Sequence, residues 1–140
     1  MSGSVSQNVS HVRVIYGDTD MMGIAYYGNY LRWFEVGRNE LIRSKGMTYR
    51  ELEAKGLVLP VAEAEVKYRK PAVYDDELEI VTAVGETGRV RIEFTYQVWR
   101  KEGPSGPREL LATGRTLHAC LTRADRKPAR LPEDVLEKLR

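Results

Sequence analysis

The chain has 140 residues, of which 42% are hydrophobic and 30% are charged, and its formal net charge is +2. This length suits one domain with a sizeable core, and the composition is typical of a soluble globular protein rather than a disordered one. The 22 basic and 20 acidic side chains are too balanced to favour a nucleic-acid-binding protein. A single cysteine, Cys120, excludes an internal disulfide and favours a reducing, cytoplasmic location.

Residues 1–10 are predicted to be a flexible N-terminus, because serine and glycine are frequent among them. They lack the basic start and apolar centre of a secretory signal. No apolar run in the sequence approaches the roughly 20 residues that a membrane helix needs, so no membrane insertion is expected.

A first strand is predicted over Val12–Tyr16, followed by a long helix that begins near Gly28 or Asn29. Glycine in the middle of this helix, at Gly37, costs roughly 1 kcal/mol relative to alanine, which indicates that another element packs closely there. A second, short helix is predicted over 48–55. The buried face of the long helix is predicted from four residues at helical spacing: Tyr30, Phe34, Gly37 and Leu41.

Four further strands are predicted after Pro60, with no helix between them. The first is expected to be half-buried because apolar and charged residues alternate along it. The absence of intervening helices favours an α+β fold, a mainly antiparallel sheet with one long helix on it. A C-terminal tail, residues 124–140, is expected to carry a short helix with Pro132 at its first position. The predicted strands cover 62–68, 78–84, 90–98 and 110–122, with turns at 74–76 and 85–88 and a loop at 102–107.

Most familiar catalytic and metal-binding patterns are absent. The loop serine with glycine neighbours, Ser105, is not in a G-x-S-x-G motif. A small buried thiol is expected at Cys120. His118 would share its sheet face, but the two side chains would run along one strand without converging, which disfavours a catalytic Cys–His pair. Two histidines and one cysteine lack zinc-ligand spacing, and the glycines form no phosphate-binding loop. We therefore expect no metal and no cofactor.

Two aspartates, Asp18 and Asp20, lie in the segment between the first strand and the long helix. One interpretation is that both are turn residues, whose side chains bond nearby backbone amides. The other is that one is a catalytic carboxylate close to the helix start, where unpaired N–H groups and the helix dipole can stabilise an oxyanion. The residues alone leave both interpretations open.

The segment YGDTDMMGIAYYGNYLRWFEVGRNELI, residues 16–42, resembles the signature of the hot-dog-fold acyl-CoA thioesterases, above all the 4-hydroxybenzoyl-CoA thioesterase-like family. The likeness continues at VKYRKPAVYDDELEI, residues 66–80. It implies a hot-dog domain over residues 11–123, in which a curved antiparallel sheet wraps around one long central helix. It also implies a homodimer with active sites at the interface, arranged further as a dimer of dimers, or homotetramer.

The resemblance also implies roles for single residues. Asp20 matches the family's catalytic carboxylate, Asp18 is structural, and Tyr27 matches the residue whose backbone N–H points at the thioester oxygen. Flexible side chains at Met21-Met22 would suit a varied acyl group. Basic side chains would meet the phosphates of coenzyme A. The candidates for substrate binding are Met21, Met22, Gly23, Asn29, Arg69, Lys70, Arg89 and Arg91.

The sequence therefore predicts hydrolysis of an acyl-CoA thioester to a carboxylic acid and CoA, with CoA entering as part of the substrate. Asp20 would act as a nucleophile or as a general base. A non-catalytic acyl-CoA-binding module on the same fold is an alternative. A hydroxyacyl-thioester dehydratase is a third, although His11 and His118 are poorly placed for it. The acyl group, and the choice between CoA and a carrier protein, stay open.

Overall fold

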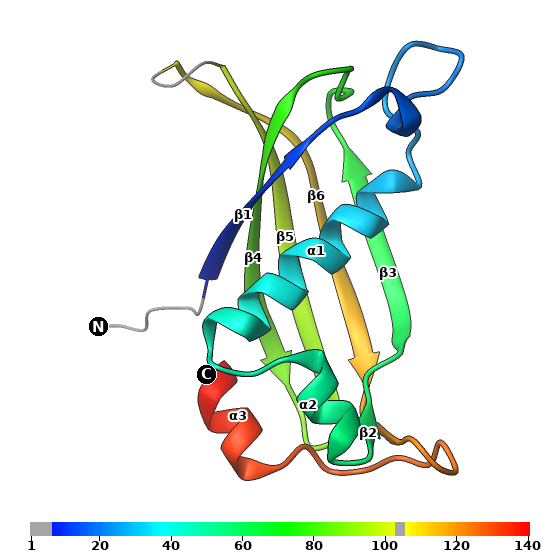
Figure 1. Cartoon of the computed structure of the whole chain (residues 1–140), viewed down its shortest axis with the longest axis vertical. Helices are drawn as coiled ribbons and strands as arrows, with labels where there is room; N and C mark the ends of the chain where they lie inside the picture. Colours follow the sequence, from blue (N-terminus) through cyan, green and yellow to red (C-terminus); the bar gives the residue numbers. More distant parts are fainter. Residues whose placement is uncertain (1–6, 103–105) are drawn as a thin grey trace.

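The computed structural model describes residues 7–102 and 106–140. The first six residues and Ser105, in the middle of the predicted 102–107 loop, lie outside the described residues. Five strands form an antiparallel sheet in the order β1-β4-β5-β6-β3 (Figure 1). A second, two-stranded sheet pairs β2 with β7. The bounds are β1 Gln7–Arg13, β2 Leu57–Val58, β3 Val61–Tyr68, β4 Glu77–Thr87, β5 Arg91–Lys101, β6 Arg108–Ala119 and β7 Leu121–Thr122.

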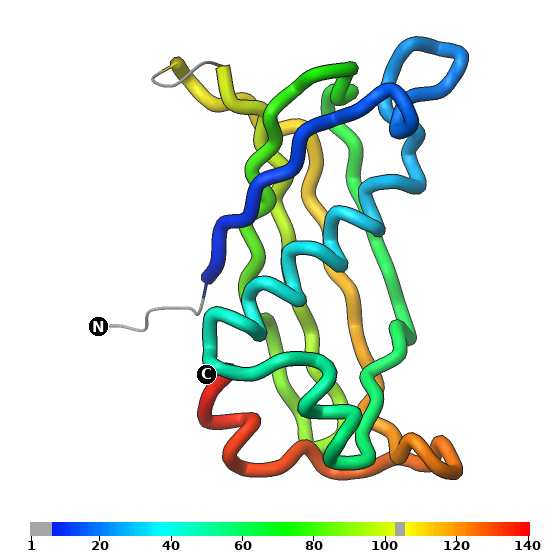
Figure 2. The backbone as a smooth tube through the Cα atoms, viewed as in Figure 1, coloured from blue at the N-terminus to red at the C-terminus, as the bar shows by residue number. Residues whose placement is uncertain are grey.

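The long helix α1 (Asn29–Ser44) lies diagonally across one face of the sheet, and the strands curve around it (Figure 2). Aromatic rings make up much of the contact: Phe34 stacks on Tyr96 of β5 with 4.1 Å between ring centroids. This is the arrangement that the resemblance implies. The helix buries all four predicted residues and two more: Tyr30, Trp33, Phe34, Gly37, Leu41 and Ile42.

The glycine in the middle of α1 lies where the helix crosses β4. A Cβ atom added to Gly37 would collide with the hydroxyl of Thr82 and lie 3.0 Å from Cγ2 of Ile80. Both β4 residues are fully buried. The close packing predicted from a mid-helix glycine is therefore confirmed.

Two short helices close the end of the sheet that lies away from the start of α1 (Figure 1). Helix α2 (Tyr49–Ala54) is capped by Thr48, whose hydroxyl accepts a hydrogen bond from Glu51 N at 3.2 Å. Helix α3 (Glu133–Leu139) begins one residue later than predicted, because Pro132 is the extended N-cap residue. The ends of α2 and α3 are joined by the ammonium of Lys55 and the carboxylate of Asp134, 2.9 Å apart.

His118 is a residue of β6, and its side chain is buried. Its Nδ1 lies 2.9 Å from the carbonyl of Leu59, and its Nε2 lies 2.8 Å from the hydroxyl of Thr116. Burial lowers the pKa of His118, which favours the neutral ring. Cys120 is also fully buried, and burial raises the pKa of its thiol. The buried thiol predicted at Cys120 is confirmed.

Three strand predictions were wrong, and the first two concern β1 and β3. The first strand occupies 7–13 rather than 12–16, so residues 7–10 of the supposed flexible N-terminus pair with Ala83–Ile80 of β4. The polar residues Asn8 and Ser10 conceal this strand's alternation. Strand β3 is exposed on both faces except at Val66, because it is an edge strand that α1 hardly covers.

The last predicted strand is divided. Residues 110–122 were taken as one strand, but β6 ends at Ala119 and β7 starts at Leu121. Cys120 lies between them, and its N–H donates to the O of Val90, the residue before β5, at 2.8 Å. Among the residues that the structure describes, no helix is long and apolar enough to cross a membrane.

The close approach of α1 to β4 predicts that Gly37→Ala lowers the free energy of unfolding by about 1–2 kcal/mol, since overpacking outweighs the better helix propensity of alanine. Urea unfolding at equilibrium measures this change. Gly88→Ala is the matched control, because an added Cβ there meets only the Arg91 carbonyl oxygen, at 4.0 Å. Equal or higher stability of Gly37→Ala would contradict the packing argument.

Candidate active site

The segment between β1 and α1 is held against the loop that precedes β4. The amide of Val14 donates to Asp76 O at 3.0 Å, and the carbonyl of Val14 accepts from Asp75 N at 2.8 Å. Further along, the amide of Ala25 donates to Ala72 O at 2.8 Å. Both ends of the segment are thus bonded to residues 72–76, so its conformation is set by the sheet.

Asp18 is a structural residue in this segment. It is only 5% exposed, and its Oδ2 accepts a hydrogen bond from Ile15 N at 3.0 Å. Its Oδ1 forms an ion pair with Arg32 in the first turn of α1. Its carbonyl accepts bonds from Tyr26 N at 2.8 Å and from Asn29 Nδ2 at 2.7 Å. Both carboxylate oxygens and the carbonyl oxygen of Asp18 are therefore engaged in bonds that hold this segment in place.

Asp20 has a different environment although it lies only two residues away. Its side chain is partly exposed, and Oδ1 accepts one bond, from Met22 N at 2.8 Å. The main chain turns tightly after it, with Gly23 N donating to Asp20 O at 3.0 Å and Gly23 at φ +79°. No cation within residues 7–102 or 106–140 pairs with Asp20. Its negative charge is therefore available for chemistry.

The start of α1 presents unpaired amides. The first helical bonds run from Asn29 N to Tyr26 O, at 3.0 Å, and from Tyr30 N to Tyr27 O, at 3.3 Å. The N–H groups of Tyr27 and Gly28 meet no acceptor in the described part of the chain. Asn29, predicted as the N-cap, is instead the first helical residue, and its side chain is engaged with Asp18. Two free N–H groups at a positive helix end form a site for an oxyanion.

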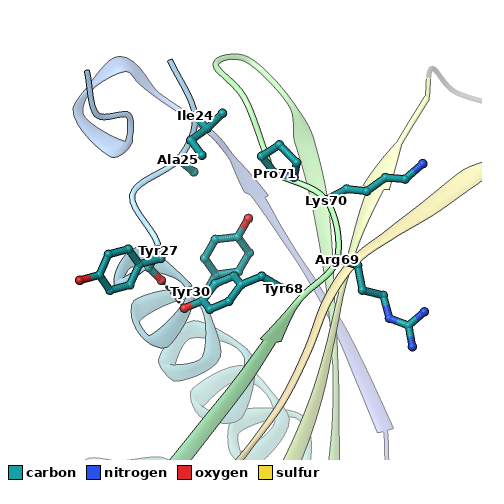
Figure 3. A pocket seen from close by; sticks show the side chains of 8 residues that line it. All are labelled: Ile24, Ala25, Tyr27, Tyr30, Tyr68, Arg69, Lys70 and Pro71. Atoms are coloured by element: carbon teal, nitrogen blue, oxygen red, sulfur yellow. Dashed lines mark hydrogen bonds between the residues drawn. The ribbon is translucent and has the colours of Figure 1, made fainter. Parts of the chain in front are cut away.

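A pocket of about 260 Å³ opens beside this helix start (Figure 3). Three tyrosines dominate it: Tyr68 and Tyr30 meet edge to face with centroids 5.0 Å apart, and Tyr27 lies at the rim. Burial raises the pKa of both Tyr30 and Tyr68, so their hydroxyls are protonated at neutral pH. The lining residues are Ile24, Ala25, Tyr27, Tyr30, Tyr68, Arg69, Lys70 and Pro71.

Of the predicted catalytic pair, Tyr27 lines this pocket and Asp20 does not. The amide of Asp20 donates to the carbonyl of the lining residue Ile24 at 3.0 Å. Asp20 is thus one backbone hydrogen bond away from a residue of the pocket wall.

The predicted substrate-binding residues fall into separate places. Arg69 and Lys70 line the pocket, although their side chains extend away from the tyrosines (Figure 3). Met21 and Met22 are largely exposed and lie outside the lining, as does Gly23. Arg89 and Arg91 lie at the other end of β4 and β5, roughly 30 Å away along the strands. A single chain therefore does not bring Arg89 and Arg91 to the pocket.

Sequence reasoning missed two residues that shape the pocket. The sequence pattern places Tyr68 among the apolar positions of its alternating strand and Tyr30 on the buried face of the long helix, and neither position by itself indicates a pocket. The Tyr68 hydroxyl donates to Tyr27 O at 2.8 Å, and the Tyr30 hydroxyl accepts from Ala72 N at 3.3 Å. The available signal was the Tyr30 hydroxyl on an otherwise apolar helix face, because a buried phenol needs a partner.

The chain was compared with known proteins. The sequence model of a family described as the thioesterase-like superfamily matches residues 14–139. The putative acyl-CoA thioesterase YneP of Bacillus subtilis is 33% identical over 117 residues, which cover 84% of this chain and 81% of that protein. The acyl-CoA thioester hydrolase YbgC of Escherichia coli is 30% identical over 129 residues, 92% of each chain.

Solved structures of thioesterases are also similar to this chain. The DHNA-CoA thioesterase from Staphylococcus aureus superposes with a TM-score of 0.87 at 32% identity, over 94% of this chain and 87% of that one. The 4-hydroxybenzoyl-CoA thioesterase from Pseudomonas sp. strain CBS-3 gives a TM-score of 0.86 at 25% identity, over 95% and 99%. The fold is the hot-dog fold.

The unequal environments of the two aspartates predict unequal effects on stability. Asp18→Asn should lower the free energy of unfolding by about 1–3 kcal/mol, because it removes the charge that pairs with Arg32. Asp20→Asn should change it by less than about 0.5 kcal/mol, since an amide oxygen can still accept from Met22 N. Equilibrium urea unfolding of both variants tests this, and equal losses would contradict the assignment of separate roles.

Proposed function

This chain belongs to the thioesterase-like superfamily, and we propose that it hydrolyses an acyl-CoA thioester to a carboxylic acid and free CoA through Asp20 and the start of α1. Relatives at 30–33% identity over most of the chain are named acyl-CoA thioesterases. The assignment of residues rests on two observations: the Asp20 carboxylate pairs with no cation among the described residues, and the Tyr27 and Gly28 amides at the helix start meet no acceptor there.

In the proposed reaction the Tyr27 N–H donates to the thioester oxygen and stabilises the negative charge that develops there. On one route, Asp20 attacks the carbonyl carbon, the CoA thiolate leaves, and water hydrolyses the resulting anhydride. On the other, Asp20 takes a proton from a water molecule that attacks instead. After a single turnover in ¹⁸O-labelled water, ¹⁸O in Asp20 would establish the first route, because water that attacks the Asp20 carbonyl of the anhydride leaves its oxygen there.

The pocket is the proposed binding site for the acyl group. Its walls are aromatic and apolar, and a volume of about 260 Å³ suits a short or single-ring acyl group rather than a long chain. Arg69 and Lys70 at its edge are the basic residues best placed to meet CoA phosphates. Lys70 also forms an ion pair with Glu109, so Arg69 is the freer of the two.

We further propose that the chain functions as a dimer formed through β3, or as a tetramer of two such dimers. The outer edge of β3 is exposed, and Tyr68 on this strand lines the pocket. Pairing two β3 edges would satisfy their backbone groups and place a partner chain next to each pocket. Light scattering after size-exclusion chromatography should give a multiple of twice the 16.0 kDa chain mass, and a monomer at micromolar concentration would contradict this.

The role of Asp20 predicts that Asp20→Asn lowers kcat by at least about 100-fold, because the amide can neither attack nor accept a proton. Release of CoA from a panel of short, long and aromatic acyl thioesters, including carrier-protein thioesters, measures this. Glu35→Gln, an exposed change on α1, is the control.

Three outcomes of the panel would contradict the proposal. Near-normal turnover by Asp20→Asn would remove Asp20 from the mechanism. Binding without any release of CoA would indicate a non-catalytic acyl-CoA-binding module. Conversion of a hydroxyacyl thioester to the enoyl thioester without thiol release would indicate a dehydratase.

A further inference from the structure

The Tyr27–Gly28 peptide group lies at the junction between the pocket and α1. Its nitrogen end is the Gly28 N–H, which has no acceptor among the described residues. Its oxygen end is the Tyr27 carbonyl, which accepts from Tyr30 N at 3.3 Å and from the Tyr68 hydroxyl at 2.8 Å. The bond from Tyr68 is the shorter of the two and comes from a residue 41 positions away, on β3.

A hydrogen bond to a carbonyl also orients the N–H at the other end of the same peptide. The peptide group is planar and trans, so its N–H and C=O point in opposite directions and rotate together. The preceding peptide is held in the same way, because Tyr26 O accepts from Asn29 N at 3.0 Å and thereby orients the Tyr27 N–H. Each free amide at the helix start is therefore fixed through the carbonyl behind it.

Tyr68 is itself held firmly enough to serve as an anchor. Its ring packs perpendicular to that of Tyr30, at an interplanar angle of 89°, and its backbone pairs with Ala112 of β6. Figure 3 shows the Tyr68 hydroxyl directed at the Tyr27 main chain. Because burial raises the pKa of Tyr68, the hydroxyl keeps its proton and remains a donor.

We propose that Tyr68 is a positioning residue for thioester hydrolysis, whose hydroxyl holds the Tyr27–Gly28 peptide so that the Gly28 N–H faces the substrate carbonyl beside the Tyr27 N–H. The inference rests on the proposed function and adds the Gly28 N–H to the Tyr27 N–H as a second donor to the thioester oxygen. Donation to the Tyr27 carbonyl also polarises the peptide and strengthens Gly28 N–H as a donor. Tyr68 touches neither the reacting carbon nor the leaving sulfur in this role.

The test is Tyr68→Phe, which removes the hydroxyl and keeps the ring. The loss of one neutral hydrogen bond in the transition state should lower kcat about three- to tenfold, while KM changes by less than about twofold. Tyr74→Phe is the matched control: Tyr74 is 45% exposed, against 48% for Tyr68, and its hydroxyl makes no hydrogen bond within the described residues. Its kcat should equal that of the unmodified protein.

A spectroscopic measurement separates positioning from a loss of packing. A ¹³C-labelled acyl-CoA bound to Asp20→Asn should show its carbonyl stretch shifted to lower frequency by the helix-start amides. Adding Tyr68→Phe should reduce that shift. An unchanged shift, or a kcat of Tyr68→Phe equal to that of Tyr74→Phe, would overturn the inference. If the unmodified protein released no CoA from any thioester, the proposed function would fail instead.

Discussion

The buried carboxylate of Asp18 is the interaction on which the site depends. One oxygen holds the amide of Ile15 at the exit of β1, and the other holds Arg32 in the first turn of α1. A charge that is 95% removed from solvent is tolerable only because both oxygens are engaged. This fixes the strand exit and the helix start relative to each other. The Asp20 turn lies within the closed segment and keeps its own charge free.

A second set of hydrogen bonds connects the same segment to the sheet. Arg100, at the end of β5, donates to Pro71 O at 3.2 Å and to Asp76 Oδ2 at 3.0 Å, which holds the 71–76 loop. In that loop, the carbonyl of Ala72 accepts a hydrogen bond from the amide of Ala25. The candidate site is therefore built on bonds to rigid elements, which is the preorganisation that stabilising a developing oxyanion requires.

How much the sequence could predict depended on how local each feature was. The helix, its buried face and the close approach at Gly37 follow from a 3.6-residue period and were predicted correctly. The bond between Tyr68 and Tyr27 spans 41 positions, and no local pattern encodes it. The exposure of β3 was missed because an alternating pattern is the same for a strand buried by a helix and for an uncovered edge.

The candidate site residues also differ in how far the sequence could place them. Asp18 and Asp20 were separated by resemblance alone, and the structure gives them the different environments that separate roles require. Arg89 and Arg91 were chosen because they are basic. The sequence could not reveal that the length of β4 separates them from the pocket of their own chain.

The most direct test of the central claim is a crystal structure of Asp20→Asn with an acyl-CoA that the unmodified protein hydrolyses. The account predicts that the thioester oxygen lies within about 3 Å of the Tyr27 amide nitrogen, with the side chain of residue 20 next to the carbonyl carbon. A thioester carbonyl bound away from the start of α1, with the Tyr27 amide still unpaired, would contradict it.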